Sequence, residues 1–536
     1  MRKLIVWLAS TALLGALLFG APAPLYAAAN DIYVGSADDD LPASSCLDPD
    51  FSTDPSDEGD INSALDAALA AVDDDGDTII ICDGEYEYQD DIGEHDGGVD
   101  WAVITIQAAD GAEVTLDGDE TYQLFNFTDM ETVSISGIAF VDAQVTGSGA
   151  AIAFDGDALT VSDCSFTDNV ATADGAAIYS DGGDVTVDNC EFTGNESPDN
   201  GAIFVDNAGA LEGVTATDST FTDNGPGEGA AISVNGSDSL VSATDSTFVN
   251  NDGNYGAITI DGGGVELTRV LMEDNDASGE DGGAVWAAEY LHVDDSTFRN
   301  NSGDSGGAIY ASAEGGHILL IENSIFENNH ADLKGGAAYL EGSLTIDNSD
   351  FARNDSLDDG GALFTDGGDV TISDSKFSSN QSGNEGGGLY LYDCLETVID
   401  HNVFLSNVAE SDGGGAINFE CEDTETEAQI SDNRFERNVA GDYGGATDDD
   451  EAKVLVYTRN SFIRNRVVLY DNHDWADGGA VWIDGGRFYR NRFVGNSAPR
   501  YGGAIYIGGR SDDGTARRNT FQGNRARRGS QYYYSR

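Results

Sequence analysis

Acidic side chains recur at one position of this sequence, three residues before a repeated Phe or Met. From the first copy to the last, the position holds Asp163, Asn189, Asp218, Asp245, Arg269, Asp295, Asn323, Asn348, Asp374, His401, Asp432, Arg459, Arg490 and Arg518. Carboxylates stacked at a regular spacing repel one another unless water, salt or Ca²⁺ lies between them. We therefore expect either a solvated acidic face or structural Ca²⁺. The metal ligands stay unassigned, because neither an EF-hand loop nor a Gly-rich nonapeptide repeat is present.

A second candidate site is the segment "VVLYDNHDWADGG" at residues 467–479. It brings together the polar and aromatic side chains of Asp471, His473, Asp474 and Trp475 in a long copy of the repeat. Binding residues often lie on a polar loop that projects from a rigid scaffold. The segment is therefore a hypothetical binding loop, and the alternative is a tolerated insertion.

Tyrosines that follow pairs of Gly form a third candidate. Tyr310, Tyr339, Tyr390, Tyr392 and Tyr506 occur at similar places in their repeats. Aligned, they would make an aromatic stripe for sugars or partner proteins. The alternative is that they pack only against neighbouring repeats.

Enzymatic chemistry on acidic polysaccharides needs carboxylates, a cation and a basic residue. Pairs of Asp are too frequent here to identify a site, and between Lys3 and Lys334 the only Lys or Arg residues are Arg269 and Arg299. We name no catalytic residue and expect no cofactor other than structural Ca²⁺. A non-enzymatic role is favoured, with a polysaccharide lyase or glycoside hydrolase as the alternative.

The elements that must position these residues come from a repeat. Phe, or once Met, is followed three residues later by Asn in fourteen copies with a mean period of about 27 residues. The copies begin at Phe166, Phe192, Phe221, Phe248, Met272, Phe298, Phe326, Phe351, Phe377, Phe404, Phe435, Phe462, Phe493 and Phe521.

Between these copies lies a second phrase, seen as Gly307-Ala308-Ile309 and Gly361-Ala362-Leu363, and alternating segments such as Leu344-Thr345-Ile346-Asp347 precede each Phe. Alternation with β-branched residues is typical of strands. A unit this short buries its apolar face only against the next copy. The sequence predicts an all-β, right-handed parallel β-helix, a solenoid in which Phe stacks on Phe.

Two residue types explain the turns of the predicted coil. Asn tolerates the left-handed conformation, so we expect the repeated Asn to be the turn residue, with its amide bonded to the Asn above and below. The Gly pair permits positive φ and close backbone approach at another corner.

The N-terminal part differs from the repeats. Residues 1–29 carry Arg2 and Lys3, an apolar run and small residues near Ala27, which is typical of a signal peptide. Residues 61–72 predict an amphipathic capping helix behind Asp60. We expect an N-terminal cap and first coils over 30–135, the β-helix over 136–528, and a short tail at 529–536, with no membrane-spanning segment after signal removal.

Six Cys allow fifteen disulfide connectivities, which the repeat register narrows. Cys164 and Cys190 occupy equivalent places in adjacent repeats, and so do Cys394 and Cys421. We predict disulfides within both pairs, and by elimination between Cys46 and Cys82. The alternative is buried thiols.

The formal net charge of −74 excludes nucleic acid as a partner. From Arg434 onward, 17 Lys and Arg outnumber 12 Asp and Glu. This asymmetry suggests self-association through the basic C-terminal end, whereas the acidic body is explained equally well by solubility or adaptation to salt.

The alternating "GGA[I/L/V]" and "F-x-x-N" phrases, from about Gly149 to Asn524, resemble the repeat of the polymorphic outer membrane proteins, bacterial autotransporter-type surface proteins. Separately, "INSALDAALAAVDDDGDTIIICDGEYEY" is similar to the opening segment of pectate-lyase-like β-helix proteins. The resemblance implies a secreted or cell-surface protein, associated with the outer membrane, that acts as an adhesin or extracellular scaffold with a protein or carbohydrate ligand. A salt-adapted envelope filament is a third hypothesis.

Overall fold

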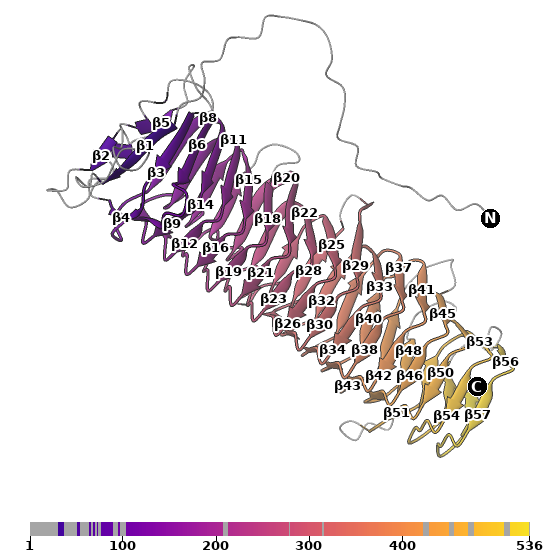
Figure 1. The fold of residues 1–536 in the computed structure, drawn as a ribbon. Helices are drawn as coiled ribbons and strands as arrows, with labels where there is room; N and C mark the ends of the chain where they lie inside the picture. The colour runs from indigo at the N-terminus through magenta and orange to yellow at the C-terminus, as the bar shows by residue number, and fades with distance from the viewer. Residues whose placement is uncertain are drawn as a thin grey trace, which may run out of the picture.

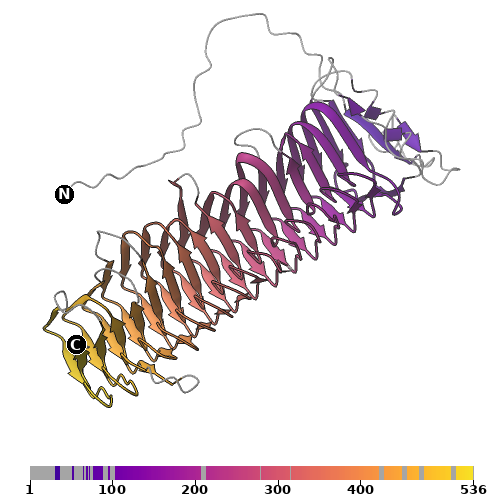
Figure 2. The same cartoon turned by 180° about the vertical axis from the view of Figure 1, so that it is seen from behind.

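The chain winds into a long rod of stacked coils, seen from two sides in Figures 1 and 2. The structure, a computed structural model, describes residues 31–36, 51–53, 64–65, 68–69, 72, 77–88, 95–96 and 103–534, except for 207–212, 278, 314–315, 422–427, 450–454, 470–475 and 509–514. The strand pairs between coils are parallel, with successive coils in register. The predicted all-β right-handed parallel β-helix is confirmed.

Each coil contributes one strand to each of several columns that run along the rod. The first coils contain β1 (Asp31–Ser36), β2 (Phe51–Thr53), β3 (Asp77–Ile81), β4 (Gly84–Glu87), β5 (His95–Asp96), β6 (Val103–Ala108), β7 (Val114–Asp117), β8 (Phe125–Ser136), β9 (Ile138–Val141) and β10 (Gln144–Val145). Four long strands serve both column one and column two, namely β8, β11 (Ile152–Ser162), β20 (Ile232–Thr244) and β22 (Ile258–Thr268).

Column one follows the Gly corners. Its other strands are β14 (Ile178–Asp181), β17 (Ile203–Asp206), β24 (Val285–Ala287), β28 (Ile309–Ser312), β32 (Ala338–Glu341), β36 (Leu363–Asp366), β40 (Leu389–Tyr392), β44 (Ile417–Glu420), β48 (Thr447–Asp449), β52 (Val481–Ile483), β55 (Ile505–Ile507) and β58 (Tyr532–Tyr534). Column two comes next in each coil, with β15 (Asp184–Asp188), β18 (Gly213–Thr217), β25 (Tyr290–Asp294), β29 (Ile318–Glu322), β33 (Ser343–Asp347), β37 (Val370–Ser373), β41 (Thr397–Asp400), β45 (Ala428–Ser431), β49 (Leu455–Thr458), β53 (Gly486–Tyr489) and β56 (Thr515–Arg517).

Column three carries the repeated Phe. It contains β9 and then β12 (Ser165–Thr167), β16 (Glu191–Thr193), β19 (Thr220–Thr222), β21 (Thr247–Val249), β23 (Leu271–Glu273), β26 (Thr297–Arg299), β30 (Ile325–Glu327), β34 (Asp350–Ala352), β38 (Lys376–Ser378), β42 (Val403–Leu405), β46 (Arg434–Glu436), β50 (Ser461–Ile463), β54 (Arg492–Val494) and β57 (Thr520–Gln522). Short two-residue strands complete the coil, at β13 (Val170–Ala171), β27 (Ser302–Gly303), β31 (His330–Ala331), β35 (Asp355–Ser356), β39 (Gln381–Ser382), β43 (Val408–Ala409), β47 (Val439–Ala440) and β51 (Arg466–Val467).

The repeated Phe side chains form the centre of the core. Phe326 pairs with Phe351 in register, and their ring centroids are 4.7 Å apart with planes 5° from parallel. Met272 replaces one ring, lies opposite Phe248 and Phe298, and is fully buried. Offset aromatic pairs at this distance add stability beyond the area they bury. The predicted Phe stack is therefore present, and Met272 takes the place of Phe in one coil.

The repeated Asn forms a buried ladder, but it is not the turn residue that the sequence predicts. In the coil of Asn301, the side-chain amide donates to the backbone oxygen of Met272 and to Oδ1 of Asn329, at 3.1 and 3.0 Å. The backbone N–H of Asn301 also donates to Asn329 Oδ1, at 3.0 Å. The positive φ belongs instead to the preceding residue, 57° at Asn300. The Asn side chain must face inward to bond two coils, so the left-handed residue comes one position earlier.

The Gly pair behaves as predicted. Gly306 has a φ of 65°, and a Cβ at Gly307 would come within 2.2 Å of the backbone oxygen of His330. Any side chain at Gly307 would force adjacent coils apart, so this position requires Gly.

At the N-terminus, Ala64, Leu65, Ala68 and Leu69 of the predicted capping helix are helical and buried, and the other residues of 61–72, apart from Val72, lie outside the described residues. The complete helix therefore stays a prediction, as does the signal peptide at 1–29, which also lies outside them. At the other end, β58 lies within the predicted tail at 529–536 and pairs with β55 of the preceding coil. Residues 532–534 of the predicted tail therefore belong to the β-helix. Within the described part of the chain, no helix has the length and apolar character needed to cross a membrane.

The ladder provides a test of what holds the coils together. Replacing Asn301 with Ala removes the amide that bonds two coils and leaves buried backbone groups without partners. We expect a loss of about 2–4 kcal/mol in unfolding free energy, measured by urea denaturation. The exposed Asn254 provides the control, and Asn254→Ala should change stability by less than about 0.5 kcal/mol. Equal effects of the two variants would contradict this role for the ladder.

Candidate binding surface

The outer face of column one carries a row of aromatic side chains. Its inward positions hold aliphatic residues such as Ile309 and Ala311, and the residue between them points outward. We call the outward row the aromatic column, and its members are Tyr179, Phe204, Trp286, Tyr310, Tyr339, Phe364, Tyr390, Trp482, Tyr506 and Tyr533.

The rings of the aromatic column stack on one another. Centroids are 6.2 Å apart for Trp286 and Tyr310, 5.1 Å for Tyr310 and Tyr339, and between 4.8 and 5.0 Å for the next two pairs. The planes of these pairs lie 5° to 15° from parallel. Most ring faces are therefore covered by a neighbour. Phe204, Phe364, Tyr390 and Tyr506 are buried, and the half-buried members present ring edges.

Carboxylates flank the aromatic column on both sides. Two residues after each ring lies the flank column, which includes Asp181, Asp206, Asp261, Glu341, Asp366 and Glu420. The Tyr310 hydroxyl donates to Glu341 of the next coil at 3.0 Å, and the Tyr390 hydroxyl donates to Glu420. Burial, followed by the charge of Glu341, raises the pKa of Tyr310 above its ordinary value. The Tyr310 hydroxyl therefore remains a protonated donor over the physiological range.

On the other side, the residue immediately before the first Gly of each corner forms the corner column. It includes Asp174, Glu228, Tyr255, Asp281, Ser305, Lys334, Asp359, Glu385, Tyr443, Asp477 and Tyr501. Its single lysine, Lys334, places Nζ 4.2 Å from the centroid of Phe364 and 3.9 Å from Asp359 Oδ2. The surface thus combines ring edges with hydrogen-bond acceptors and negative charge, a composition suited to polar or cationic groups.

Four of the five predicted stripe tyrosines meet in this column, and the fifth does not. Tyr392 lies opposite Asp366 in the flank column and is 41% exposed. Tyr179, Phe204 and Tyr533 were not predicted, and neither were Trp286, Phe364 and Trp482. The signal for the last three was available, because each follows the inward aliphatic residue of a Gly-Gly-Ala phrase, as in Gly-Gly-Ala-Val-Trp at 282–286.

The acidic positions before each Phe are left-handed corner residues on another side of the rod. Asp163, for example, has a φ of 53° and Asp245 a φ of 52°. Their repulsion is relieved by polar partners in the next coil, because Asn189 donates to Asp163 at 2.6 Å and Arg269 bonds both oxygens of Asp245 at 2.6 Å. At these two positions, side chains of the neighbouring coil provide partners for the carboxylates.

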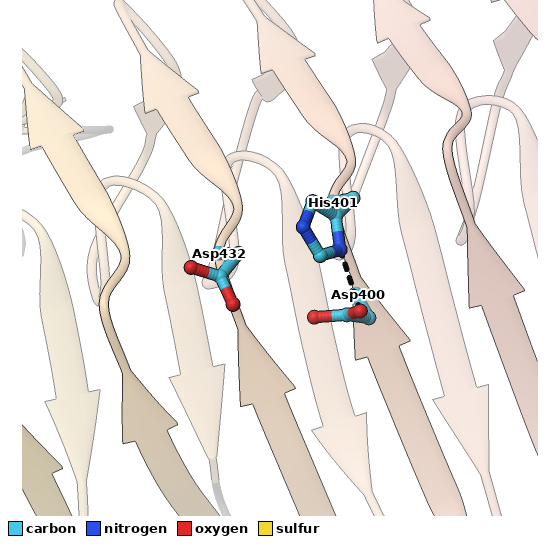
Figure 3. Close-up of side chains that lie close together, drawn as sticks. All are labelled: Asp400, His401 and Asp432. Atoms are coloured by element: carbon cyan, nitrogen blue, oxygen red, sulfur yellow. Dashed lines mark hydrogen bonds and ion pairs between the residues drawn. The ribbon is translucent and has the colours of Figure 1, made fainter.

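One group of potential metal ligands lies in this row, where Asp400, His401 and Asp432 offer ligand atoms within 4.8 Å of one another (Figure 3). Asp400 bonds His401 Nδ1 at 2.6 Å, which raises the His401 pKa. Arg459 bonds both oxygens of Asp432 and lowers the pKa of that carboxyl. The potential ligand atoms of this group already bond to protein side chains, so the group is best described as an ion-pair network. Structural Ca²⁺ stays a prediction.

The hypothetical binding loop of Asp471, His473, Asp474 and Trp475 lies outside the described residues. It therefore stays a prediction, as does self-association through the basic C-terminal end.

The predicted cysteine pairs have different outcomes. Cys394 and Cys421 form a disulfide between adjacent coils, with Cα atoms 4.9 Å apart. Cys82 is disulfide-bonded, and its predicted partner Cys46 lies outside the described residues.

The predicted bridge between Cys164 and Cys190 is absent, since both are free, buried thiols. Each sulfur lies against backbone groups of the preceding coil. The Ile138 N–H lies 3.5 Å from Cys164 Sγ, and Cys190 Sγ lies 3.6 Å from the Val161 oxygen. In later coils Ser or Asn usually takes this place, and Ser219 Oγ accepts from the Cys190 N–H.

These thiols line an open cavity of about 520 Å³ together with Asp163, Asn189 and Asp218. Burial raises the pKa of Cys164 to about 12 and that of Cys190 to about 11. Because the thiolate is the nucleophilic form, neither sulfur is activated for covalent chemistry at neutral pH.

The family model for the right handed beta helix region matches residues 101–269, 230–381 and 282–467, which together span more than half of the chain. The chain belongs to the right-handed β-helix family. Within this family member, residues 492–508 also match the repeat of the Chlamydia polymorphic membrane proteins.

Two individual proteins resemble this family member. A probable outer membrane protein, pmp20, of Chlamydia pneumoniae is 31% identical over 121 residues, which are 21% of this chain and 7% of that protein. Among solved structures, the PL6 family alginate lyase AlyGC aligns over 94% of this chain and 99% of its own, at 12% identity and a TM-score of 0.26. The chain thus matches only a small part of the length of its curated relative.

The cysteine assignment predicts a site-specific alkylation pattern. In denaturant without reductant, Cys164 and Cys190 should be alkylated, whereas Cys394 and Cys421 should not. In the native protein at neutral pH, alkylation of the two thiols should be slow because burial keeps them protonated. Peptide mass mapping measures each site, and a linked peptide containing both Cys164 and Cys190 would refute the assignment.

The raised pKa of Asp359 leads us to expect that the stability of the protein depends on pH. Burial, followed by the charge of Asp358, raises the pKa of Asp359 from 3.8 to about 6, although Lys334 opposes the shift. A carboxyl with a raised folded-state pKa contributes stability below its unfolded pKa and loses that contribution as the pH rises through about 6.

Asp359→Asn should therefore be more stable than the parent at about pH 8, by up to about 3 kcal/mol, and similar to it near pH 4. The melting temperatures of both proteins across this range provide the measurement. Asp188→Asn, at an exposed position in β15, should follow the parent profile. A difference between Asp359→Asn and the parent that is constant with pH would show that Asp359 does not titrate as described.

Proposed function

We propose that this protein is displayed at the cell surface, in association with the outer membrane or after secretion, and acts as an adhesin-type scaffold that binds extracellular ligands. The observation that carries the proposal is the face of column one, where aromatic and carboxylate side chains recur in successive coils. The match of residues 492–508 to the polymorphic membrane protein repeat and the similarity to an outer membrane protein support the location.

A stiff rod suits this role for a physical reason. Every coil presents the same outward positions about 4.8 Å apart, so weak contacts can add along one extended ligand. Because the backbone is fixed by pairing with two neighbours, little conformational entropy is lost when the face binds. Carboxylates dominate the face, which favours basic proteins or neutral glycans as ligands over acidic polymers.

Location is tested by labelling intact cells of the native organism with an impermeant biotin reagent and an antibody to the rod. We expect labelling without permeabilisation. Labelling only after lysis would contradict surface display.

Binding is tested with the purified protein on a glycan array and on immobilised extracellular-matrix proteins. The double variant Glu341→Lys and Asp366→Lys reverses charge on the proposed face, and Asp188→Lys with Glu191→Lys makes the same change elsewhere on the rod. We expect the first variant to lose about tenfold or more in affinity and the second to bind as the parent does. Equal losses, or turnover of a uronate polymer with no binding, would contradict the proposal.

A further inference from the structure

The aromatic column is interrupted twice, once at Asn418 and Asp448 and once nearer the N-terminus, in two successive coils. Between Phe204 and Trp286 its positions are taken by Ser233 and Thr259, which are paired in register with these neighbours. The missing rings leave a cavity of about 190 Å³ lined by Glu228, Tyr255, Thr259, Asp261 and Trp286. We call this cavity the column gap.

Two aromatic rings wall the column gap at an angle. One face of Trp286 is covered by Tyr310, whereas its partner on the other side is the small Thr259. Tyr255 comes from the corner column, with its centroid 5.8 Å from that of Trp286 and its plane tilted by 51°. The gap is thus a place where the surface offers an aromatic face rather than an edge.

The polar wall of the column gap is negatively charged. Among the described residues, no side chain or backbone group donates a hydrogen bond to the carboxylate of Glu228 or Asp261, and no Lys or Arg lines the gap. Burial, followed by the charge of Asp261, raises the Glu228 pKa. An electron-rich ring face beside two carboxylates without partners favours a bound cation.

The chain itself shows how an ammonium group sits on this surface. Lys334 occupies the corner position of its coil, and its Nζ lies over Phe364 of the next coil and near Asp359. In the column gap, Tyr255 occupies the position equivalent to Lys334, and Trp286 the position equivalent to Phe364. The gap therefore has the aromatic ring, and it has two acids at other positions, Glu228 and Asp261, but no Lys or Arg lines it.

We propose that the column gap binds an organic ammonium group, either the side chain of a lysine on a partner or a quaternary ammonium headgroup. The ammonium lies against the exposed face of Trp286 and the ring of Tyr255, and Glu228 and Asp261 balance its charge. The inference deepens the proposed function and rests on it only in placing a ligand on the same face.

A second tyrosine and tryptophan pair provides a matched control. Tyr443 and Trp482 have centroids 5.5 Å apart and a tilt of 54°, close to the values for Tyr255 and Trp286. At this site the residue equivalent to Thr259 is Asp448, whose carboxylate lies where a side chain at Gly413 would stand. Here the acid is fully buried and is not open at the surface beside the tryptophan, so we expect no ammonium site.

The test uses isothermal titration of the purified chain with choline, Nα-acetyl-lysine amide and 3,3-dimethylbutanol. The alcohol has the shape of choline without its charge. We expect one of the two ammonium compounds to bind, and the alcohol to bind at least about tenfold more weakly than choline if choline is the ligand. Binding of choline alone would identify a headgroup site, and binding of the lysine compound alone or more tightly would identify a lysine site.

Variants separate binding from folding. Trp286→Ala and Glu228→Gln should each weaken binding by about tenfold, whereas Trp482→Ala should leave it unchanged. Thr259→Tyr places a ring beside Trp286 and should abolish binding while keeping the parent melting temperature. Equal binding of choline and the alcohol, equal losses in Trp286→Ala and Trp482→Ala, or no binding of either ammonium compound would overturn the inference. Because the titration needs no adhesion, its failure would leave binding by the rest of the face intact.

Discussion

The rod depends on satisfying the backbone at its corners. Strands bond to strands of the next coil, but at each turn the chain bends away and leaves N–H and C=O groups that the strand columns cannot reach. The buried Asn ladder serves these groups, since the amide of Asn301 joins its coil to both neighbours. A Ser and Asn ladder serves the other corner in the same way, for example where Ser296 accepts from Val270. Without these side chains the interior would hold unpaired polar groups at every turn.

This constraint explains why inward and outward positions of a coil tolerate different residues. Inward positions are limited to residues that fit between identical neighbours, such as Phe326 on Phe351 and Ala at the narrow Gly corner. Outward positions are not limited in this way. The aromatic column therefore contains runs of stacked rings separated by small, polar or charged residues. The binding face, including the column gap at Ser233 and Thr259, is therefore free to vary while the rod stays the same.

Much of this fold could be predicted from the sequence, because equivalent residues of a solenoid meet in space. The Phe stack and the Cys394 to Cys421 disulfide both followed from register alone. The register does not show that the repeated Asn faces inward, or that the left-handed residue comes one position before it. It also could not tell that Cys164 and Cys190 point at backbone groups, because that depends on side-chain direction. The column gap could not be predicted for a different reason: it arises from rings that are missing at Ser233 and Thr259, and no motif of the sequence marks a missing side chain.

In the described part of the rod, strands pair with the coils directly before and after them, and this also determines how the rod responds to force. A pull on the C-terminal strand is resisted by one layer of hydrogen bonds at a time, so detachment proceeds as peeling, coil after coil, and not as a single rupture. The Cys394 to Cys421 link closes a loop of one coil and interrupts that sequence, because the chain between the two sulfurs cannot be extended. Resistance to a pulling force is thus shared by successive coils along the rod, and the disulfide is a point at which peeling is halted.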